Sequence, residues 1–366
     1  MKRSVVLLVL SVALLLSVGL LMVFNTTAAE IIDRSQDINT HAALYKHSLH
    51  GLLGLLLGMV AYRLGYEGVL RWAIPILSGV TLLLVLVFVP GIGQKINGAH
   101  RWLNVFGFSF QPSECAKIAI PAVFIQWVLK QQGEVQWKSF VHILIWLSLP
   151  IGLILIEPDN GTTAILSSAL VVLFFLARIQ WRYWVLPLIF LFAVGVGAIS
   201  SMPHASARIN IYLHPELDLK GKGHQPHQAK IAAGSGGLFG RGLGESLQKL
   251  NYLPEARSDY IAAVYAEETG FLGMLGLIGL YAMFTYAGCS IALRAKDRGA
   301  FLLAASLTFL ISSQAFLNLG IVSGLLPSKG MNLPFFSHGG TSLMVNLAAL
   351  FLLLDIARKS GVVYEA

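Results

Sequence analysis

Asp259 is the residue best placed to do acid–base chemistry. It lies near the end of a long polar segment that begins at Gln225, shortly before the apolar run 269–293. A carboxylate at such a boundary is partly removed from water, which raises its pKa and suits it to accept a proton near neutral pH. The alternative is structural, because Ser258 and Asp259 would open a helix and Asp is a favoured N-cap residue. The residues alone leave both interpretations open.

Glu114 and Lys117 form a second candidate group, because both lie inside the otherwise apolar stretch 112–129. Residues three apart share one face of a helix, where opposite charges can neutralise each other. The two side chains could therefore line a polar cavity, or they could form an ion pair that only holds helices together.

Three other motifs carry polar groups. Glu157 and Asp159 belong to a Glu-Pro-Asp-Asn-Gly run, which could bind a substrate or could be only a tight turn. The glycines within 234–244 resemble a nucleotide loop, but no Gly-Lys-Ser/Thr follows them and the dinucleotide spacing fails. Their backbone amides could still bind a diphosphate. Glu267 and Glu268 could be a polar patch where a helix leaves the membrane surface.

The composition identifies the class of protein that must position these groups. Hydrophobic residues make up 56% of the chain, charged residues make up 12%, and the mean hydropathy is +0.71. These values indicate an integral membrane protein. Eight uncharged stretches can each cross a hydrocarbon core of about 30 Å: 4–29, 72–94, 139–156, 160–177, 183–207, 269–293, 299–328 and 330–354. Two less regular stretches, 47–62 and 112–129, bring the expected number of spans to ten.

We expect these spans to be helices. The runs are continuous in Leu, Val, Ile, Ala and Phe, without the alternation of a β-barrel strand. The sequence therefore predicts an all-α polytopic membrane protein with ten transmembrane helices. Residues 1–30 imitate a signal peptide, but their apolar run of about twenty residues exceeds the usual 7 to 15, so we expect the first span there.

The basic residues predict the orientation of the chain. Thirteen Lys and Arg residues fall at the termini and in even-numbered loops, whereas five fall in the short odd-numbered loops. This asymmetry predicts that both termini are cytoplasmic. We expect one membrane domain over residues 1–366, with 202–258 as a long extracytoplasmic loop between spans seven and eight. The net charge of +8 is largely this topological signal together with the bases of the long loop, so it implies no nucleic-acid partner.

This orientation places the unusual polar motifs on the outer side. They are Asn97 to Trp102, Glu157 to Asp159, the long loop and Leu326 to Gly330. We therefore expect an outward-facing polar cavity with the Glu114–Lys117 pair at its floor. Cys115 and Cys289 fall within predicted spans, which argues against a disulfide framework or a zinc site.

A set of short motifs, in chain order, carries a resemblance to a known family. They are Asn97-Gly98-Ala99-His100-Arg101-Trp102, Gln111-Pro112-Ser113-Glu114 with Lys117, Glu157-Pro158-Asp159, Gln248 to Ala256, Asp259, Glu267-Glu268 with Gly270, Gly324 to Pro327, Lys329-Gly330, Leu333-Pro334-Phe335 and Ser337-His338-Gly339-Gly340. Together they resemble the SEDS family (shape, elongation, division and sporulation) over nearly the whole chain. The segment from Lys249 to Ala256 is more similar to division-type than to elongation-type members.

The resemblance implies a ten-span glycosyltransferase that polymerises lipid II into peptidoglycan strands. An acceptor N-acetylglucosamine 4-hydroxyl would attack the anomeric carbon of a donor N-acetylmuramic acid with inversion, releasing undecaprenyl diphosphate. Asp259 matches the family's catalytic aspartate and would be the general base. The resemblance also implies binding roles for six residues: Glu114 and Lys117 beside the base, Arg101 and Lys329 at the diphosphates, and Glu157 and Asp159 at sugar or at a divalent cation such as Mg or Mn.

The resemblance further implies a class B penicillin-binding protein as partner, among other division proteins, in the bacterial cytoplasmic membrane at the division site. Two alternatives remain, a lipid II flippase and a non-catalytic division scaffold. The chain also departs from the usual family pattern. Arg257-Ser258 replaces His-Thr, and Ala262 replaces an aromatic residue, which puts details of the donor site in doubt.

Overall fold

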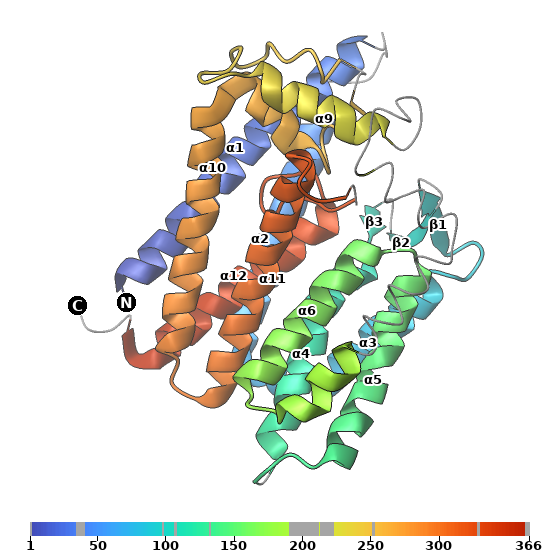
Figure 1. Ribbon diagram of the computed structural model, residues 1–366, viewed down its shortest axis with the longest axis vertical. Coiled ribbons are helices and arrows are strands. Elements are labelled where there is room, and N and C mark those ends of the chain that lie inside the picture. Colours follow the sequence, from blue (N-terminus) through green and yellow to red (C-terminus); the bar gives the residue numbers. More distant parts are fainter. Residues whose placement is uncertain are drawn as a thin grey trace.

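The structure, a computed structural model, describes residues 2–33, 41–96, 99–105, 108–131, 133–189, 212, 223–250, 253–327 and 330–362. Its helices are α1 (Lys2–Asp33), α2 (Ala42–Arg71), α3 (Ala73–Leu86), α4 (Pro112–Lys130), α5 (Trp137–Ile156), α6 (Asn160–Leu176), α9 (His224–Ser235), α10 (Ile261–Leu293), α11 (Arg298–Val322) and α12 (Gly340–Ala357), followed by a π-helical turn (Arg358–Val362). Residues 181–189 are also helical. The chain is therefore mainly a bundle of long helices (Figure 1).

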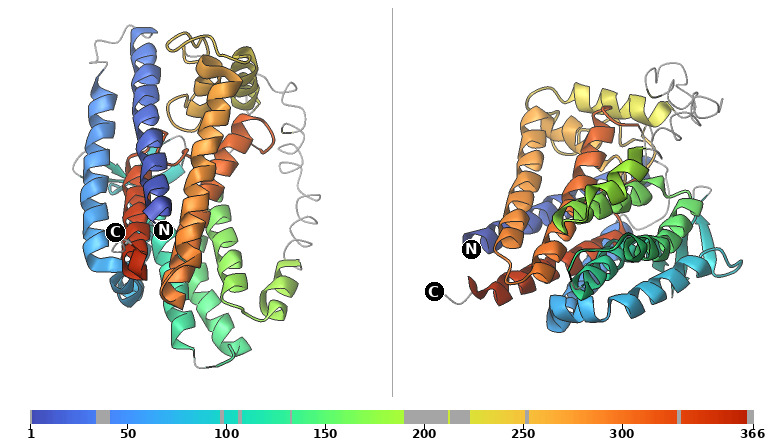
Figure 2. Two further views of the ribbon diagram at one scale, coloured as in Figure 1. Left: turned by 90° about the vertical axis from the view of Figure 1, so that its left-hand side faces the viewer. Right: turned by 60° about the horizontal axis from the view of Figure 1, so that its bottom comes forward.

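Six of the described helices are long and apolar enough to cross a membrane: α1, α2, α5, α10, α11 and α12. Helices α3 and α6 are apolar but shorter. The predicted span 183–207 lies mostly outside the described residues, so the expected number of ten spans stays a prediction. The chain starts and ends on the same side of the bundle, as Figures 1 and 2 show, which requires an even number of crossings.

Helices α11 and α12 form the centre of the bundle. In their most apolar stretches, 61% and 78% of the residues are buried, against 17% to 33% in the other four long helices. Helix α12 packs closely on α2, where a Cβ at Gly58 would lie 2.4 Å from the Phe351 ring. Small residues allow such close approach between membrane helices. The central helices are thus the rigid elements on which a site can be built.

The expected boundary of the tenth span was wrong. We predicted a helix over 330–354, but α12 begins at Gly340, and residues 330–339 are not helical. Proline at 334 cannot donate within a helix. Non-helical backbone is tolerated at membrane depth where protein covers it, and here Leu333, Phe335 and Phe336 are buried while Tyr281 donates to the Pro334 carbonyl at 2.6 Å. An uncharged sequence alone does not reveal such a segment.

The fold also contains a small sheet, so the prediction of an all-α fold was incomplete. Strands β1 (Gly93–Ile96), β2 (Ala99–Val105) and β3 (Phe108–Phe110) are antiparallel in that order, with Gly93 opposite Leu103 and Leu103 opposite Phe110. The first strand occupies the end of the predicted span 72–94, because α3 already stops at Leu86. The sheet lies beside the ends of α3 to α6 (Figure 1).

Candidate active site

A polar cavity of about 740 Å³ lies where the ends of several helices meet β2 and the segment before α12. Five of the seven predicted site residues line it: Arg101, Glu114, Lys117, Asp159 and Asp259. Glu157 does not line it, and Lys329 lies outside the described residues. The structure thus brings the Glu114–Lys117 pair and Asp259 to the wall of one polar cavity, while its expected outward orientation stays a prediction.

Asp259 does not cap a helix. The N-cap of α10 is Tyr260, which makes no side-chain cap hydrogen bond, so the structural alternative for Asp259 was wrong. The Asp259 side chain instead lines the cavity, where a Cβ at Gly330 would lie 2.9 Å from its Oδ2 atom. The backbone at Gly330 therefore lies directly against the Asp259 carboxylate.

The environment of Asp259 makes its carboxyl a weak acid. Burial raises the pKa of Asp259 to about 7, the negative charge of Glu255 adds to the rise, and Arg101 opposes it. A group with a pKa near the working pH is present in both protonation states and can therefore exchange a proton during a reaction. A carboxylate with such a pKa can accept a proton near neutral pH.

The Glu114–Lys117 pair is more than a contact between two neighbours on α4. Lys117 Nζ lies 2.8 Å from Glu114 Oε1 and also donates to Gln314 Oε1 on α11 at 2.8 Å. Gln314 Nε2 in turn donates to the Asn332 carbonyl at 2.8 Å. All three side chains line the cavity. The pair therefore holds α4, α11 and the segment before α12 together while it presents an ammonium group to the cavity.

Arg101 is fixed by the turn between α5 and α6. Its Nε and one terminal nitrogen donate to the carbonyls of Glu157 at 3.0 Å and Pro158 at 2.6 Å. A guanidinium has five N–H donors, so these two bonds orient Arg101 and leave it able to bind an anion in the cavity. The Glu157–Pro158 turn therefore holds the Arg101 cation in place. Neither substrate binding nor a simple tight turn, the two roles considered for this motif, includes that function.

Asp159 and Glu157 have different surroundings. Asp159 caps α6 by accepting from the Thr162 amide at 3.2 Å and accepts from the Gln111 side chain at 3.1 Å. Glu157 is fully buried, and its two carboxyl oxygens have no partner among the described residues. Burial and the charge of Asp159 raise the pKa of Glu157 to about 8, against the effect of Arg101. Asp159 lines the cavity and Glu157 does not, and the expected binding of sugar or a divalent cation by these residues stays a prediction.

The described part of the chain contains no group of three or more His, Cys, Asp and Glu side chains arranged to hold a metal ion. The Asp159 side chain lines the cavity, where it can accept a hydrogen bond from a sugar hydroxyl.

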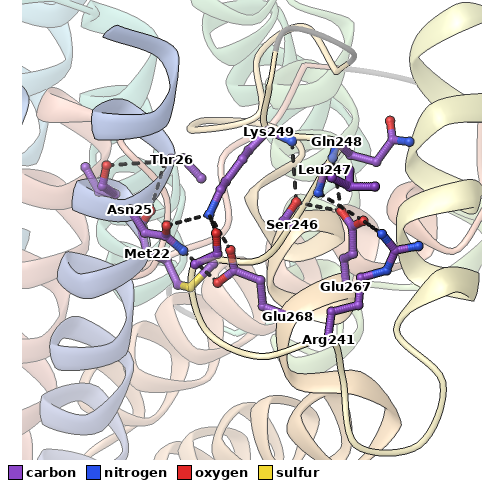
Figure 3. Close-up of polar contacts among 12 residues, drawn as sticks. Met22, Asn25, Thr26, Arg241, Ser246, Leu247, Gln248, Lys249, Glu267 and Glu268 are labelled. Atoms are coloured by element: carbon purple, nitrogen blue, oxygen red, sulfur yellow. Dashed lines mark hydrogen bonds and ion pairs between the residues drawn. The ribbon is translucent and has the colours of Figure 1, made fainter. Parts of the chain in front are cut away.

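Glu267 and Glu268 are buried, not a surface patch, so that expectation was wrong. Glu267 accepts from the Ser246 hydroxyl and from the amides of Leu247 and Gln248 at 3.2 Å. Figure 3 shows these bonds beside the second cluster, in which Lys249 lies between Glu268 and α1. The two carboxylates thus fasten the polar loop to α10.

The glycine-rich segment is also used structurally. Helix α10 has a non-helical residue at Gly270, with φ of 69°, so the carbonyls of Glu267 and Glu268 lack their helical partners. The amides of Arg241 and Gly242 donate to these two carbonyls at 3.0 and 3.1 Å. These two amides are therefore occupied, and the suggestion that backbone amides of this segment bind a diphosphate stays a prediction for the others.

Two residues that position the site were missed in the sequence. They are Gln314 and Asn318, one helical turn apart on α11, within the uncharged span predicted over 299–328. Asn318 donates to the backbone carbonyls of Asp259 and Met331. Polar amides at i and i+4 in an uncharged span are the signal that could have found them, because a buried amide needs hydrogen-bond partners.

Comparisons with known proteins agree over the length of the chain. The FtsW, RodA and SpoVE family model, described as "Cell cycle protein", matches residues 5–361. A probable peptidoglycan glycosyltransferase FtsW from Trichlorobacter lovleyi is 36% identical and covers 96% of this chain and 92% of its own length. Stage V sporulation protein E of Bacillus subtilis is 34% identical and covers 97% of each chain.

Solved structures show the same fold. A chain from a study of the structural coordination of polymerization and crosslinking by a peptidoglycan synthase complex gives a TM-score of 0.78, with 27% identity over 98% of each chain. The rod shape determining protein RodA of Thermus thermophilus gives a TM-score of 0.69, with 28% identity over 98% of this chain and 97% of its own. This chain therefore belongs to the FtsW, RodA and SpoVE family, as its motifs had indicated.

Proposed function

We propose that this protein is a peptidoglycan glycosyltransferase that polymerises lipid II, with Asp259 as its general base. The observation that carries the proposal is a carboxyl with a pKa of about 7 on the wall of a cavity that also contains the ammonium of Lys117 and the guanidinium of Arg101. A base and two cations in one cavity suit a reaction that deprotonates a hydroxyl and releases an anion.

In the proposed reaction, the acceptor 4-hydroxyl oxygen attacks the anomeric carbon of the donor sugar. The bond from that carbon to the diphosphate oxygen breaks, and its electron pair leaves with undecaprenyl diphosphate. The hydroxyl proton passes to the Asp259 carboxylate. Lys117 and Arg101 stabilise the negative charge that develops on the diphosphate, and Lys329 is the third proposed cation. Because Arg101 is held by two backbone carbonyls, little reorganisation is needed when charge develops.

Three finer assignments belong to the same proposal. The named FtsW relatives support a role in septal wall synthesis, at the division site of the bacterial cytoplasmic membrane. The peptidoglycan synthase complex among the solved structures supports a class B penicillin-binding protein as partner. The positive-inside pattern supports an outward-facing cavity, with the loop 202–258 on the outer side.

The decisive experiment compares Asp259→Asn with wild type in glycan polymerisation from lipid II. The purified proteins are assayed with their penicillin-binding partner. Glu245→Gln is the matched control, since it neutralises an exposed carboxylate of the same loop that does not line the cavity. We expect Asp259→Asn to lose activity by at least about 100-fold, in keeping with the usual contribution of a general base, while Glu245→Gln stays active.

The two alternative functions give different results. A flippase would transport lipid II across vesicles equally well with Asp259→Asn, and a scaffold would support division in cells that contain only this variant. Undiminished polymerisation by Asp259→Asn would reject the mechanism. The same assay with a chelator tests the expected divalent cation. Activity that falls with chelator and returns with Mg or Mn would support that cation, and unchanged activity would remove it.

A further inference from the structure

A second hollow lies at the opposite end of α6 from the catalytic cavity. Helix α6 starts beside Asp159 and runs for 17 residues, which is about 25 Å at 1.5 Å per residue. Beyond its last turn, a hollow of about 900 Å³ is walled by Phe175, Trp181, Trp184 and Phe301, with Arg178 and Arg298 among its lining residues. It shares no lining residue with the cavity described above.

Arg178 stands where the backbone favours glycine. Its φ is 55°, in the left-handed region. Its amide donates to the Phe175 carbonyl at 3.0 Å, and the Ile179 amide donates to the Phe174 carbonyl at 3.0 Å. These two bonds define a Schellman motif with Arg178 at the C′ position, where glycine is usual because it has no Cβ. Strained backbone persists where the surrounding structure or function requires it, so the Arg178 side chain is a candidate for a binding role.

Arg298 brings a second guanidinium to the same hollow. One of its terminal nitrogens donates to the Ala177 carbonyl at 2.8 Å, which anchors the first residue of α11 to the end of α6. This contact uses one of the five N–H donors of the group. Arg182 adds a third positive charge nearby and lies over the Trp181 ring at 5.8 Å.

Two acidic side chains of this region face other partners. Glu134 accepts from the Gln180 side chain at 3.2 Å. Asp297 accepts from the Tyr66 hydroxyl at 2.5 Å and from the Ala300 amide at 2.9 Å. Among the described residues, neither carboxylate forms an ion pair with Arg178 or Arg298, so both guanidinium groups can still pair with an anion.

The walls of the hollow suit an acyl chain rather than a soluble ligand. Phe175, in the last turn of the apolar helix α6, is 71% exposed, and Trp181, at the start of the helical segment 181–189, is 57% exposed. Tryptophan is enriched at membrane interfaces, and basic pockets between helices on the cytoplasmic side bind anionic lipid headgroups. An apolar wall with a cationic rim matches a molecule with a negative head and hydrocarbon tails.

We propose that the hollow between Arg178 and Arg298 binds the headgroup phosphate of an anionic phospholipid, whose acyl chains lie along Phe175 and Phe301. Both arginines donate to the phosphate oxygens, and the lipid bridges the end of α6 to the start of α11. Lipid composition would then control how firmly these two helices are held together. The proposal does not depend on the catalytic role of Asp259.

The test measures thermal unfolding of the full chain in detergent while lipid is added. Phosphatidylglycerol is compared with phosphatidylcholine of the same acyl chains and with inorganic phosphate. We expect phosphatidylglycerol alone to raise the melting temperature in a saturable way. Arg178→Gly and Arg298→Gln should each need at least about tenfold more phosphatidylglycerol for half the effect, because each loses a charged hydrogen bond.

Arg178→Gly also separates binding from folding. Glycine suits the left-handed backbone at this position, so the variant without lipid should melt no lower than wild type. If Arg178→Gly melts lower than wild type without lipid, the phosphatidylglycerol response of Arg298→Gln is the test of binding. The matched control is Arg3→Gln, which removes an exposed positive charge from α1, outside the hollow. It should keep the wild-type lipid response.

Four outcomes would overturn the proposal. They are an equal response to phosphatidylcholine, an unchanged phosphatidylglycerol response in both Arg178→Gly and Arg298→Gln, a full response to inorganic phosphate alone, and displacement of phosphatidylglycerol by undecaprenyl phosphate at less than a tenth of its concentration. The third result would indicate a site for free anions. The fourth would indicate a site for the polyprenyl substrate.

Discussion

The side-chain amide of Asn318 donates a hydrogen bond to the backbone carbonyl of Asp259, with 2.8 Å between the two atoms. The same nitrogen donates to the Met331 carbonyl at 2.7 Å. Asn318 is only 1% exposed. One buried residue of the central helix α11 therefore ties the proposed base to the segment that approaches its carboxylate at Gly330.

We expect Asn318→Ala to lower kcat by about 10- to 100-fold with little change in KM, because a small displacement of a catalytic group can cost that much. It should also destabilise the fold by about 1 to 3 kcal/mol, since two buried carbonyls lose their donor. Polymerisation kinetics and unfolding in detergent measure the two effects. Asn346→Ala is the control, because Asn346 is also buried, and among the described residues its side chain bonds to Ser342 on the same helix, α12. Equal kcat values for the two variants would contradict the positioning role.

The ion pair on α4 gives a second test, which separates structural from functional roles. Lys117→Met leaves Glu114 buried without its partner and should cost about 3 to 5 kcal/mol. The double variant Glu114→Gln with Lys117→Met removes both charges and should recover most of that stability. If Lys117 also stabilises the leaving diphosphate, the double variant stays inactive although it is folded. Recovery of activity together with stability would show that the pair only holds helices.

Much of this arrangement could be predicted from the sequence, and the reasons are physical. Long uncharged stretches predict membrane helices because charges are costly in lipid, and Asp259, Glu114 and Lys117 stood out against that background. The segment 330–339 was misassigned because buried non-helical backbone has the same apolar composition as a span. Gln314 and Asn318 were missed because neutral amides do not interrupt an uncharged run. Their importance depends on which backbone carbonyls they meet, and that is decided by packing.

The pKa of Asp259 predicts how activity depends on pH. The base must be ionised to accept a proton, and its pKa is raised to about 7. We therefore expect kcat/KM to rise as the pH increases through about 7 and to fall below it. Lipid II polymerisation at several pH values measures this rising part of the pH profile of kcat/KM. A rising limb centred below pH 5 would contradict the raised pKa, and a limb that persists in Asp259→Asn would belong to another group.

The same raised pKa has an opposite consequence for stability. The ordinary value for Asp is 3.8, so between about pH 4 and pH 7 the folded protein binds this proton more tightly than the unfolded chain does. Stability therefore falls as the pH rises through this window. Asp259→Asn should melt at a higher temperature than wild type at pH 7.5, and the difference should shrink at pH 5. A variant that melts lower at both pH values would contradict the linkage.

The buried cluster around Lys249 gives a final prediction, about how the polar loop is held. Lys249 Nζ lies 2.8 Å from Glu268 Oε1 and also donates to Asn25 Oδ1 at 2.8 Å, so one ammonium joins the loop to α10 and α1 (Figure 3). The Glu268 side chain is fully buried. In Lys249→Met, the side-chain partner left to that carboxylate among the described residues would be the Asn25 amide, which donates at 2.6 Å.

We therefore expect Lys249→Met to cost about 3 to 5 kcal/mol, whereas Lys230→Met, an exposed lysine on α9, should change stability by less than about 0.5 kcal/mol. Adding Glu268→Gln to Lys249→Met should recover much of the loss, because no uncompensated charge then remains buried. Unfolding in detergent measures all three variants. A loss in Lys249→Met no larger than in Lys230→Met would mean that Lys249 is not needed and that the Glu267 side chain and the backbone bonds of the glycine-rich segment hold the loop on α10.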